Sequence, residues 1–306
     1  MHPELPEFLR LCREAGIAQP TARRYVEILE DTLLMFTVPA WSGNLGTRLT
    51  DRLNGILLPL LSSLSDGGVY MVGYFISEAM DAPRKAISRI ISPLISEKWS
   101  LGKLAEIEDL YKKSALNQLI VGLALLLAVW VSVDDLFRIM PNGEAFSRGK
   151  YVILLLGIAR LVDMATGVNT EILSFTSHYR YNFYLTIFLG VFNLAANLLL
   201  IPIYKLNGAA LAALLSVTAY NLLKFFVLRW KMRIQPFSVR MVLAVSAAGV
   251  AWLAVSWLPE FDSAFLGVLV KSPVALAIFG GLVLGLKISP EVNGLASNLW
   301  SKINRR

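Results

Sequence analysis

Long apolar runs separated by short polar segments make up most of the chain from about residue 33 onward. A helix needs about 20 apolar residues to cross a bilayer, and each run is about that long or longer. The pattern therefore predicts an all-α integral membrane protein with about eight transmembrane helices. These cover residues 33–61, 68–95, 115–136, 151–177, 182–203, 208–228, 240–258 and 264–286.

The fourth run, 151–177, is apolar enough to cross a bilayer and yet carries charges. At about 100° per residue, its polar residues fall on a single helix face: Arg160, Asp163, Gly167, Glu171 and Ser174. A charge at the bilayer centre costs a few kcal/mol, so this face should meet protein or a water-filled cavity. Two interpretations stay open and are compatible: the face lines a solute or ion pathway, or an Arg160–Asp163 pair fixes two helices together.

Other runs also carry polar stripes. The first contains Arg48, Asp51 and Arg52, and the fifth contains Asn193 and Asn197 one turn apart. Asparagines inside a membrane either meet a polar substrate or hydrogen-bond between helices. The second run becomes amphipathic towards its end, where Pro83 predicts a kink. Its stripe lines the same pathway or forms a solvated half-helix, and consists of Glu78, Asp81, Lys85 and Arg89.

Composition agrees with a membrane protein, since 56% of residues are hydrophobic and 17% charged, against about 25% charged in soluble domains. The net charge of +7 does not indicate nucleic-acid binding, because the basic residues sit at the ends of apolar runs. A single cysteine, Cys12, excludes an intrachain disulfide. With two histidines we expect neither a metal site nor a cofactor, and the polar first 30 residues predict no cleavable signal peptide.

The lysines and arginines alternate along the chain. They concentrate in 1–31, 96–113, 224–240 and 287–306 and are sparse in the intervening loops, which predicts that both termini are cytoplasmic. Lys224 counts here as part of a basic cytoplasmic stretch, and Lys271 is expected to snorkel to the interface. The predicted organisation is a cytoplasmic segment (1–31), a six-helix lobe (32–230), two additional helices (231–288) and a cytoplasmic tail (289–306).

Several stretches carry a family resemblance. They are TDRLNGILL at 50–58, GGVYMVGYFI at 67–76, YKKSALNQLIVG at 111–122, DMATGVNTEIL at 163–173 and LLLIPIYKLNGAALAALLSVTAYNLLKFF at 198–226. In this order they resemble the polysaccharide and O-antigen flippases of the multidrug/oligosaccharidyl-lipid/polysaccharide exporter superfamily. In the last stretch Ile201-Pro202, Tyr204 and Gly208-Ala209-Ala210 match the family pattern, while Lys205 replaces the usual glycine.

The resemblance implies a MATE-like fold, with two six-helix lobes around a central cavity and often two further helices. This chain matches the second lobe plus the two extra helices, so a first lobe or a second chain is expected to complete it. The implied function is to move polyprenyl-diphosphate-linked sugars across the bacterial cytoplasmic (inner) membrane for polysaccharide or lipopolysaccharide assembly. The implied partners are membrane lipid and the lipid-linked oligosaccharide, not nucleic acid.

A flippase must shield sugars and a diphosphate from hydrocarbon, and arginine suits the diphosphate because its planar fork binds phosphate bidentately. We therefore expect Arg48, Arg52 and Arg160 to bind the diphosphate. Carboxylates would hold these arginines between loads or bind a coupling cation, and asparagines would bind sugar hydroxyls. The carboxylates are Asp51, Asp163 and Glu171, and the asparagines are Asn169, Asn193 and Asn197.

Three alternatives remain. A membrane-embedded enzyme of polysaccharide assembly is disfavoured, because the longest outer loop, 137–149, is about 13 residues and no run contains a candidate catalytic histidine. We therefore expect no catalytic residues. The other two alternatives are half of a MATE-like drug or cation antiporter and a remnant that does not transport.

Overall fold

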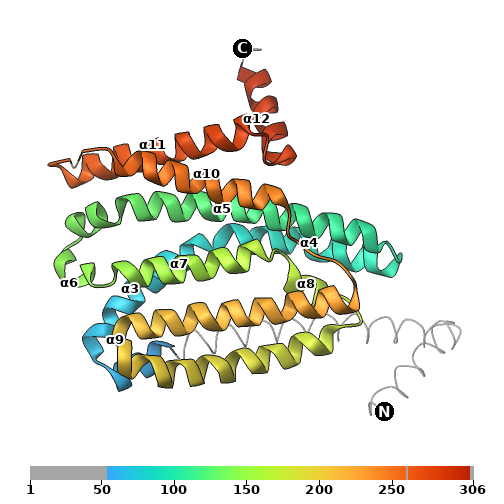
Figure 1. Cartoon of the computed structure of the whole chain (residues 1–306), viewed down its shortest axis with the longest axis horizontal. Coiled ribbons are helices and arrows are strands. Elements are labelled where there is room, and N and C mark those ends of the chain that lie inside the picture. Colours follow the sequence, from blue (N-terminus) through green and yellow to red (C-terminus); the bar gives the residue numbers. More distant parts are fainter. Residues whose placement is uncertain (1–53, 260, 304–306) are drawn as a thin grey trace, which may run out of the picture.

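The computed structural model describes residues 54–259 and 261–303, and every regular element within these ranges is a helix (Figure 1). Most of the long helices lie side by side, and α12 leaves α11 at a steep angle. The helices are α3 (Leu64–Met80), α4 (Ala82–Ser100), α5 (Leu104–Ile139), α6 (Gly143–Ser147), α7 (Lys150–Ala165), α8 (Asn169–Ser174), α9 (Tyr179–Lys231), α10 (Val239–Ser256), α11 (Ala264–Gly285) and α12 (Pro290–Ile303).

Four of the described helices are long and apolar enough to cross a membrane: α5, α9, α10 and α11. Many of their large apolar side chains are exposed, among them Leu199, Val242 and Phe265. Such a perimeter is stable only in lipid, so the chain is a multi-pass membrane protein. The predicted first run falls largely outside the described residues, and with it Arg48, Asp51 and Arg52.

Helix α5 is the central element. It packs on α7 and α4 on one side and on α10 and α11 on the other. One apolar core lies between α5, α10 and α11 and includes Leu119, Ala251 and Phe279. A second joins α3, α7 and α9, and a third lies where α4, α5, α8 and α9 meet. Helix α5 therefore connects the predicted lobe to its two additional helices.

Two of the predicted membrane runs are broken rather than continuous. The kink predicted at Pro83 is a full break, because Asp81 ends α3 and precedes α4. The single helix predicted over 151–177 is wrong. Helix α7 ends at Ala165, Gly167 adopts φ +60°, and the short α8 follows. A Cβ on Gly167 would lie 2.9–3.1 Å from Ala115 of α5, so glycine permits both the turn and the close approach.

Helix α5 corrects another expectation. The third run was predicted over 115–136, but α5 begins at Leu104 and runs unbroken for 36 residues. Its length of about 54 Å exceeds the ~30 Å hydrocarbon core, so its charged first turns extend beyond the membrane. There Lys98 and Lys103 both pair with Glu106 across the α4–α5 turn.

Helix α9 contains the predicted fifth and sixth runs as two antiparallel arms joined at Lys205, where φ is 49° and ψ is −122°. The arms lie so close together at Gly208 that a Cβ there would be only 2.2 Å from the Leu200 carbonyl oxygen, and glycine avoids this clash. Hydrogen bonds cross between the arms, including Thr186–Tyr220 at 3.3 Å. Small residues, Gly208, Ala209 and Ala210, follow the turn and are buried where the arms meet.

A buried ion pair fastens α11 to α5. Lys271 was expected to snorkel, but its Nζ lies 2.7 Å from Asp135 Oδ2, and the Asp135 side chain is 4% exposed. Beside it Ser272 donates to the Ala128 carbonyl oxygen at 3.0 Å. A Cβ on Gly267 would lie within 2.4 Å of the Asp135 carboxylate, so α11 can approach only with glycine there. The helix pair α10–α11 is thus fixed by polar as well as apolar contacts.

We predict that Lys271→Met destabilises the protein by about 3–5 kcal/mol, because it leaves the buried Asp135 carboxylate with only a 3.4 Å contact to Arg138. Adding Asp135→Asn should recover much of the loss. The measurement is thermal unfolding in detergent. Asp134→Asn is the matched control, since Asp134 is 67% exposed and its pair with Lys150 should contribute less than about 1 kcal/mol. Equal losses for Lys271→Met and Asp134→Asn would contradict the assignment.

Candidate functional site

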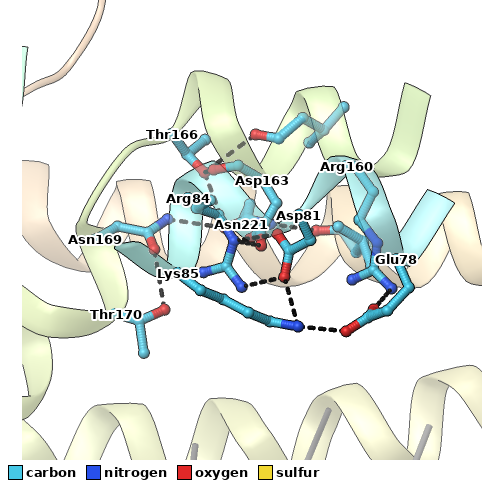
Figure 2. A network of polar contacts seen from close by, with 12 residues as sticks. Glu78, Asp81, Arg84, Lys85, Arg160, Asp163, Thr166, Asn169, Thr170 and Asn221 are labelled. Carbon is cyan, nitrogen blue, oxygen red and sulfur yellow. Dashed lines mark hydrogen bonds and ion pairs between the residues drawn. The ribbon is translucent and has the colours of Figure 1, made fainter. Parts of the chain in front are cut away.

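Charged side chains gather where the two helix breaks meet (Figure 2). They come from the end of α3, the first turn of α4, the last turns of α7 and the second arm of α9. We call this group the charged cluster. It comprises Glu78, Asp81, Arg84, Lys85, Arg160, Asp163 and Asn221.

Arg84 bridges the two breaks. Its guanidinium makes a bidentate contact with Asp81, with Nε–Oδ1 at 2.5 Å and Nη2–Oδ2 at 2.9 Å. The same Nε lies 3.2 Å from Asp163 Oδ2 on α7. The Asp81 side chain is 1% exposed, and Arg84 is its closer cation, since Lys85 Nζ lies 3.4 Å from Asp81 Oδ2. A single arginine therefore ties the α3–α4 break to the end of α7.

Lys85 and Glu78 form the more open edge of the cluster, and Arg160, whose side chain is 18% exposed, reaches Glu78 from α7. Arg160 Nη2 donates to Glu78 Oε2 at 2.8 Å, and Lys85 also pairs with Glu78. The Lys85 and Glu78 side chains are 47% and 33% exposed. The ion pair considered from the sequence, Arg160–Asp163, is replaced by Arg160–Glu78 and Arg84–Asp163. The helix break explains this, since residues from α3 and α4 reach both α7 side chains.

Asn221 links the cluster to α8. Its amide donates to Asp163 Oδ1 at 3.0 Å and accepts from Thr166 and Asn169 at 3.0 and 2.9 Å. Asn169, considered from the sequence as a sugar contact, is thus engaged with protein. The Asn169–Asn221 hydrogen bond thus holds the start of α8 to the second arm of α9.

Lys224 corrects a sequence-based expectation. It was assigned to a basic cytoplasmic stretch, but it is 1% exposed in the interior. Its Nζ donates to Thr170 Oγ1 at 2.6 Å and lies 3.5 Å from the centroid of the Tyr220 ring. The cation–π contact and the hydroxyl together compensate part of the cost of burying the ammonium. Lys224 therefore adds a positive charge to the α8–α9 side of the charged cluster.

The other sequence candidates lie in different surroundings. Glu171 is half-buried on α8, two residues from Asn169. Asn193 and Asn197 are buried between helices, where Asn193 donates to Ser216 at 3.3 Å and Asn197 donates to Asn54 at 2.6 Å. These amides bond between segments, as one of the two sequence interpretations expected.

Sequence reasoning missed Arg84, Asn221 and Lys224. Arg84 follows Pro83 and lies three residues after Asp81, a spacing at which side chains meet on a helix, so it could have been found. Asn221 carried no comparable signal, because Asp163 is 58 residues away. Lys224 has Tyr220 four residues before it, but its hydrogen-bond partner Thr170 is 54 residues away.

Among the described residues, the charged cluster contains three cations and three carboxylates, and Lys224 lies beside it as a further cation. A phosphate group entering from the open edge could replace a carboxylate, since both accept charge-assisted hydrogen bonds from the same donors. Among the described residues, no group of three or more His, Cys, Asp or Glu is arranged to hold a metal ion.

Comparison with known proteins gives two likenesses, and no family model matches the chain. The chain is 26% identical over 210 residues to the probable flippase AglR of Haloferax volcanii, covering 68% of this chain and 43% of that protein. The lipid II flippase MurJ, solved in an inward closed conformation, superposes with a TM-score of 0.60 at 11% identity, covering 79% of this chain and 52% of MurJ. The chain thus has a MurJ-like fold and spans about half the length of these proteins.

Arg84 should be the stabilising cation of the cluster. We expect Arg84→Gln to cost about 3 kcal/mol in unfolding free energy, because Asp81 and Asp163 lose their shared partner. Lys85→Gln, one residue along, should cost less than about 1 kcal/mol because that side chain is half exposed. Thermal unfolding of both variants in detergent tests this. A larger loss for Lys85→Gln would refute the ranking.

Proposed function

We propose that the chain is part of a flippase that moves a polyprenyl-diphosphate-linked oligosaccharide across a membrane for polysaccharide or lipopolysaccharide assembly. The observation that carries the proposal is the charged cluster, in which the half-buried Arg160 and the exposed Lys85 both pair with Glu78 beside two interrupted runs. The MurJ-like fold and the likeness to a probable flippase support it.

The cluster suggests how the diphosphate is handled. Arg84 is held by two carboxylates and keeps the helix breaks together. Arg160 has the planar fork that binds phosphate bidentately, and its partner Glu78 is accessible. In this proposal the diphosphate competes with Glu78 for Arg160 and Lys85. When the substrate leaves, Glu78 again forms its ion pairs with both cations. Carboxylates thus hold the cations between loads.

A complete transporter needs a cavity with two sides. We propose that this chain supplies the second six-helix lobe and two further helices of a MATE-like arrangement, about eight spans in all. A first lobe or a second chain would then close the cavity. Arg48, Asp51 and Arg52 on the first run should face the same polar surface as Arg160, Asp163 and Glu171, because neither stripe can face lipid cheaply. Asn193 and Asn197 would support its wall.

We propose the bacterial cytoplasmic membrane as the location, with both termini in the cytoplasm, from the distribution of lysine and arginine. The expected outer positions Leu64, Asn142 and Asp262 are exposed, as is Ser100 on the expected inner side. With Cys12 replaced, cysteines at the three outer positions should react with an impermeant maleimide in intact cells, and one at Ser100 should react only after lysis. The reverse labelling pattern would refute the orientation.

A further prediction concerns Arg160. It applies to the transporter assembled from this chain together with the first lobe or second chain that closes its cavity. Arg160→Ala should lower loading of the lipid-linked substrate more than about tenfold, and Arg160→Lys less, because lysine keeps the charge but loses the fork. Flipping in proteoliposomes, normalised to the amount of folded protein, gives the readout. Arg180→Ala is the control, since Arg180 is exposed outside the cluster. Normal flipping by well-folded Arg160→Ala would end the proposal that Arg160 binds substrate.

A further inference from the structure

A polar groove of about 520 Å³ lies at the end of the bundle that carries the α9 turn, well away from the charged cluster. Three segments far apart in the sequence form it: the turn before α3, the segment between α6 and α7, and the α9 turn. Its polar lining residues are Ser62, Ser63, Asp66, Arg148, Lys205 and Asn207.

Lys205 occupies this groove in a backbone conformation that disfavours lysine. Its φ of 49° and ψ of −122° are those of the first central position of a type II′ turn, which glycine dominates. A non-glycine residue held there strains the backbone. Stability alone would therefore favour glycine at the turn, and the lysine must be explained by its side chain.

The charges in the groove do not balance. Arg148 lies 3.6 Å from Asp66 Oδ1 and donates to Ser65 Oγ at 3.0 Å. Asp66 also accepts from Ser62 Oγ at 2.5 Å. Lys205 is exposed and has no carboxylate of the described residues within ion-pair distance, so the groove keeps one net positive charge.

Apolar side chains that suit lipid surround the groove. Leu61 and Tyr204 line it and are exposed, and Leu64 and Ile203 beside them are also exposed. A cationic pocket directly above an apolar surface matches an anionic lipid, whose phosphate lies at the interface while its acyl chains lie below. A free anion would use the cations but not this apolar border.

We propose that this groove binds the headgroup phosphate of an anionic membrane phospholipid, with Lys205 as its main cation and Arg148 as the second. The binding site is separate from the charged cluster and does not depend on the proposed transport. The strain at Lys205 is then retained because glycine would remove the ammonium that holds the phosphate.

The strain makes the proposal testable, because Lys205→Gly relieves the backbone strain and at the same time removes the positive charge. Stability and lipid binding should therefore change in opposite directions. In detergent without lipid, Lys205→Gly should unfold at the same temperature as the natural chain or higher. In contrast, its affinity for phosphatidylglycerol, measured by native mass spectrometry of the full chain, should fall about fivefold, the amount expected for one cation at a membrane surface. Affinity for phosphatidylcholine should not change.

Lys287→Gly is the matched control, since Lys287 is also an exposed lysine at positive φ, 50°, but follows α11 at the opposite end of the bundle. It should leave the phosphatidylglycerol preference intact. Lys205→Arg should also keep it, whereas Arg148→Gln should lower it. If Lys205→Gly expresses poorly, Lys205→Asn serves instead, because asparagine tolerates positive φ.

Three results would overturn the proposal. One is an unchanged phosphatidylglycerol preference in the double variant Lys205→Gly/Arg148→Gln. The second is an equal loss in Lys287→Gly, which would mean that any surface lysine contributes. The third is competition by millimolar inorganic phosphate that abolishes phosphatidylglycerol binding, which would identify a free-anion site instead of a lipid site.

Discussion

The cost of an unpaired charge inside a membrane determines most of this structure. The described helices bring lysines and arginines into the interior, and the buried ones meet carboxylates, hydroxyls or an aromatic ring. Arg84 satisfies two acids at once, and Lys271 compensates Asp135 in the α5–α11 contact. The Arg84–Asp163 and Lys271–Asp135 pairs join elements distant in sequence, so these contacts both neutralise charge and fix which helices are neighbours.

Hydrophobic periodicity predicted the all-helical membrane class and the approximate positions of the helices, because burial in lipid requires long apolar runs. Pro83 indicated one interruption, but the sequence pattern did not reveal the one at Gly167, which depends on the close approach of Gly167 to Ala115. For the same reason it placed Arg160, Asp163 and Glu171 on one continuous face, whereas Glu171 lies on a separate helix, α8.

The positions of lysines and arginines in the sequence did not reliably predict whether each side chain is buried in the protein or exposed. Lys224 and Lys271 were both assigned to water or to the interface, and both are bonded inside the protein. Counting cations at the ends of runs cannot distinguish a buried lysine with a distant partner from a solvated one. Arg84 was detectable from its spacing to Asp81, whereas the partners of Asn221 and Lys224 became visible only in three dimensions.

Helix α5 runs unbroken for 36 residues beside two runs that are interrupted, α3–α4 at Asp81 and α7–α8 at Gly167. Both interruptions lie at the charged cluster, where Arg84 of α4 pairs with Asp163 of α7. Each interruption leaves helix ends whose backbone groups lack intrahelical partners, so one ion pair joins the two places in this part of the bundle where helical hydrogen bonding is least complete.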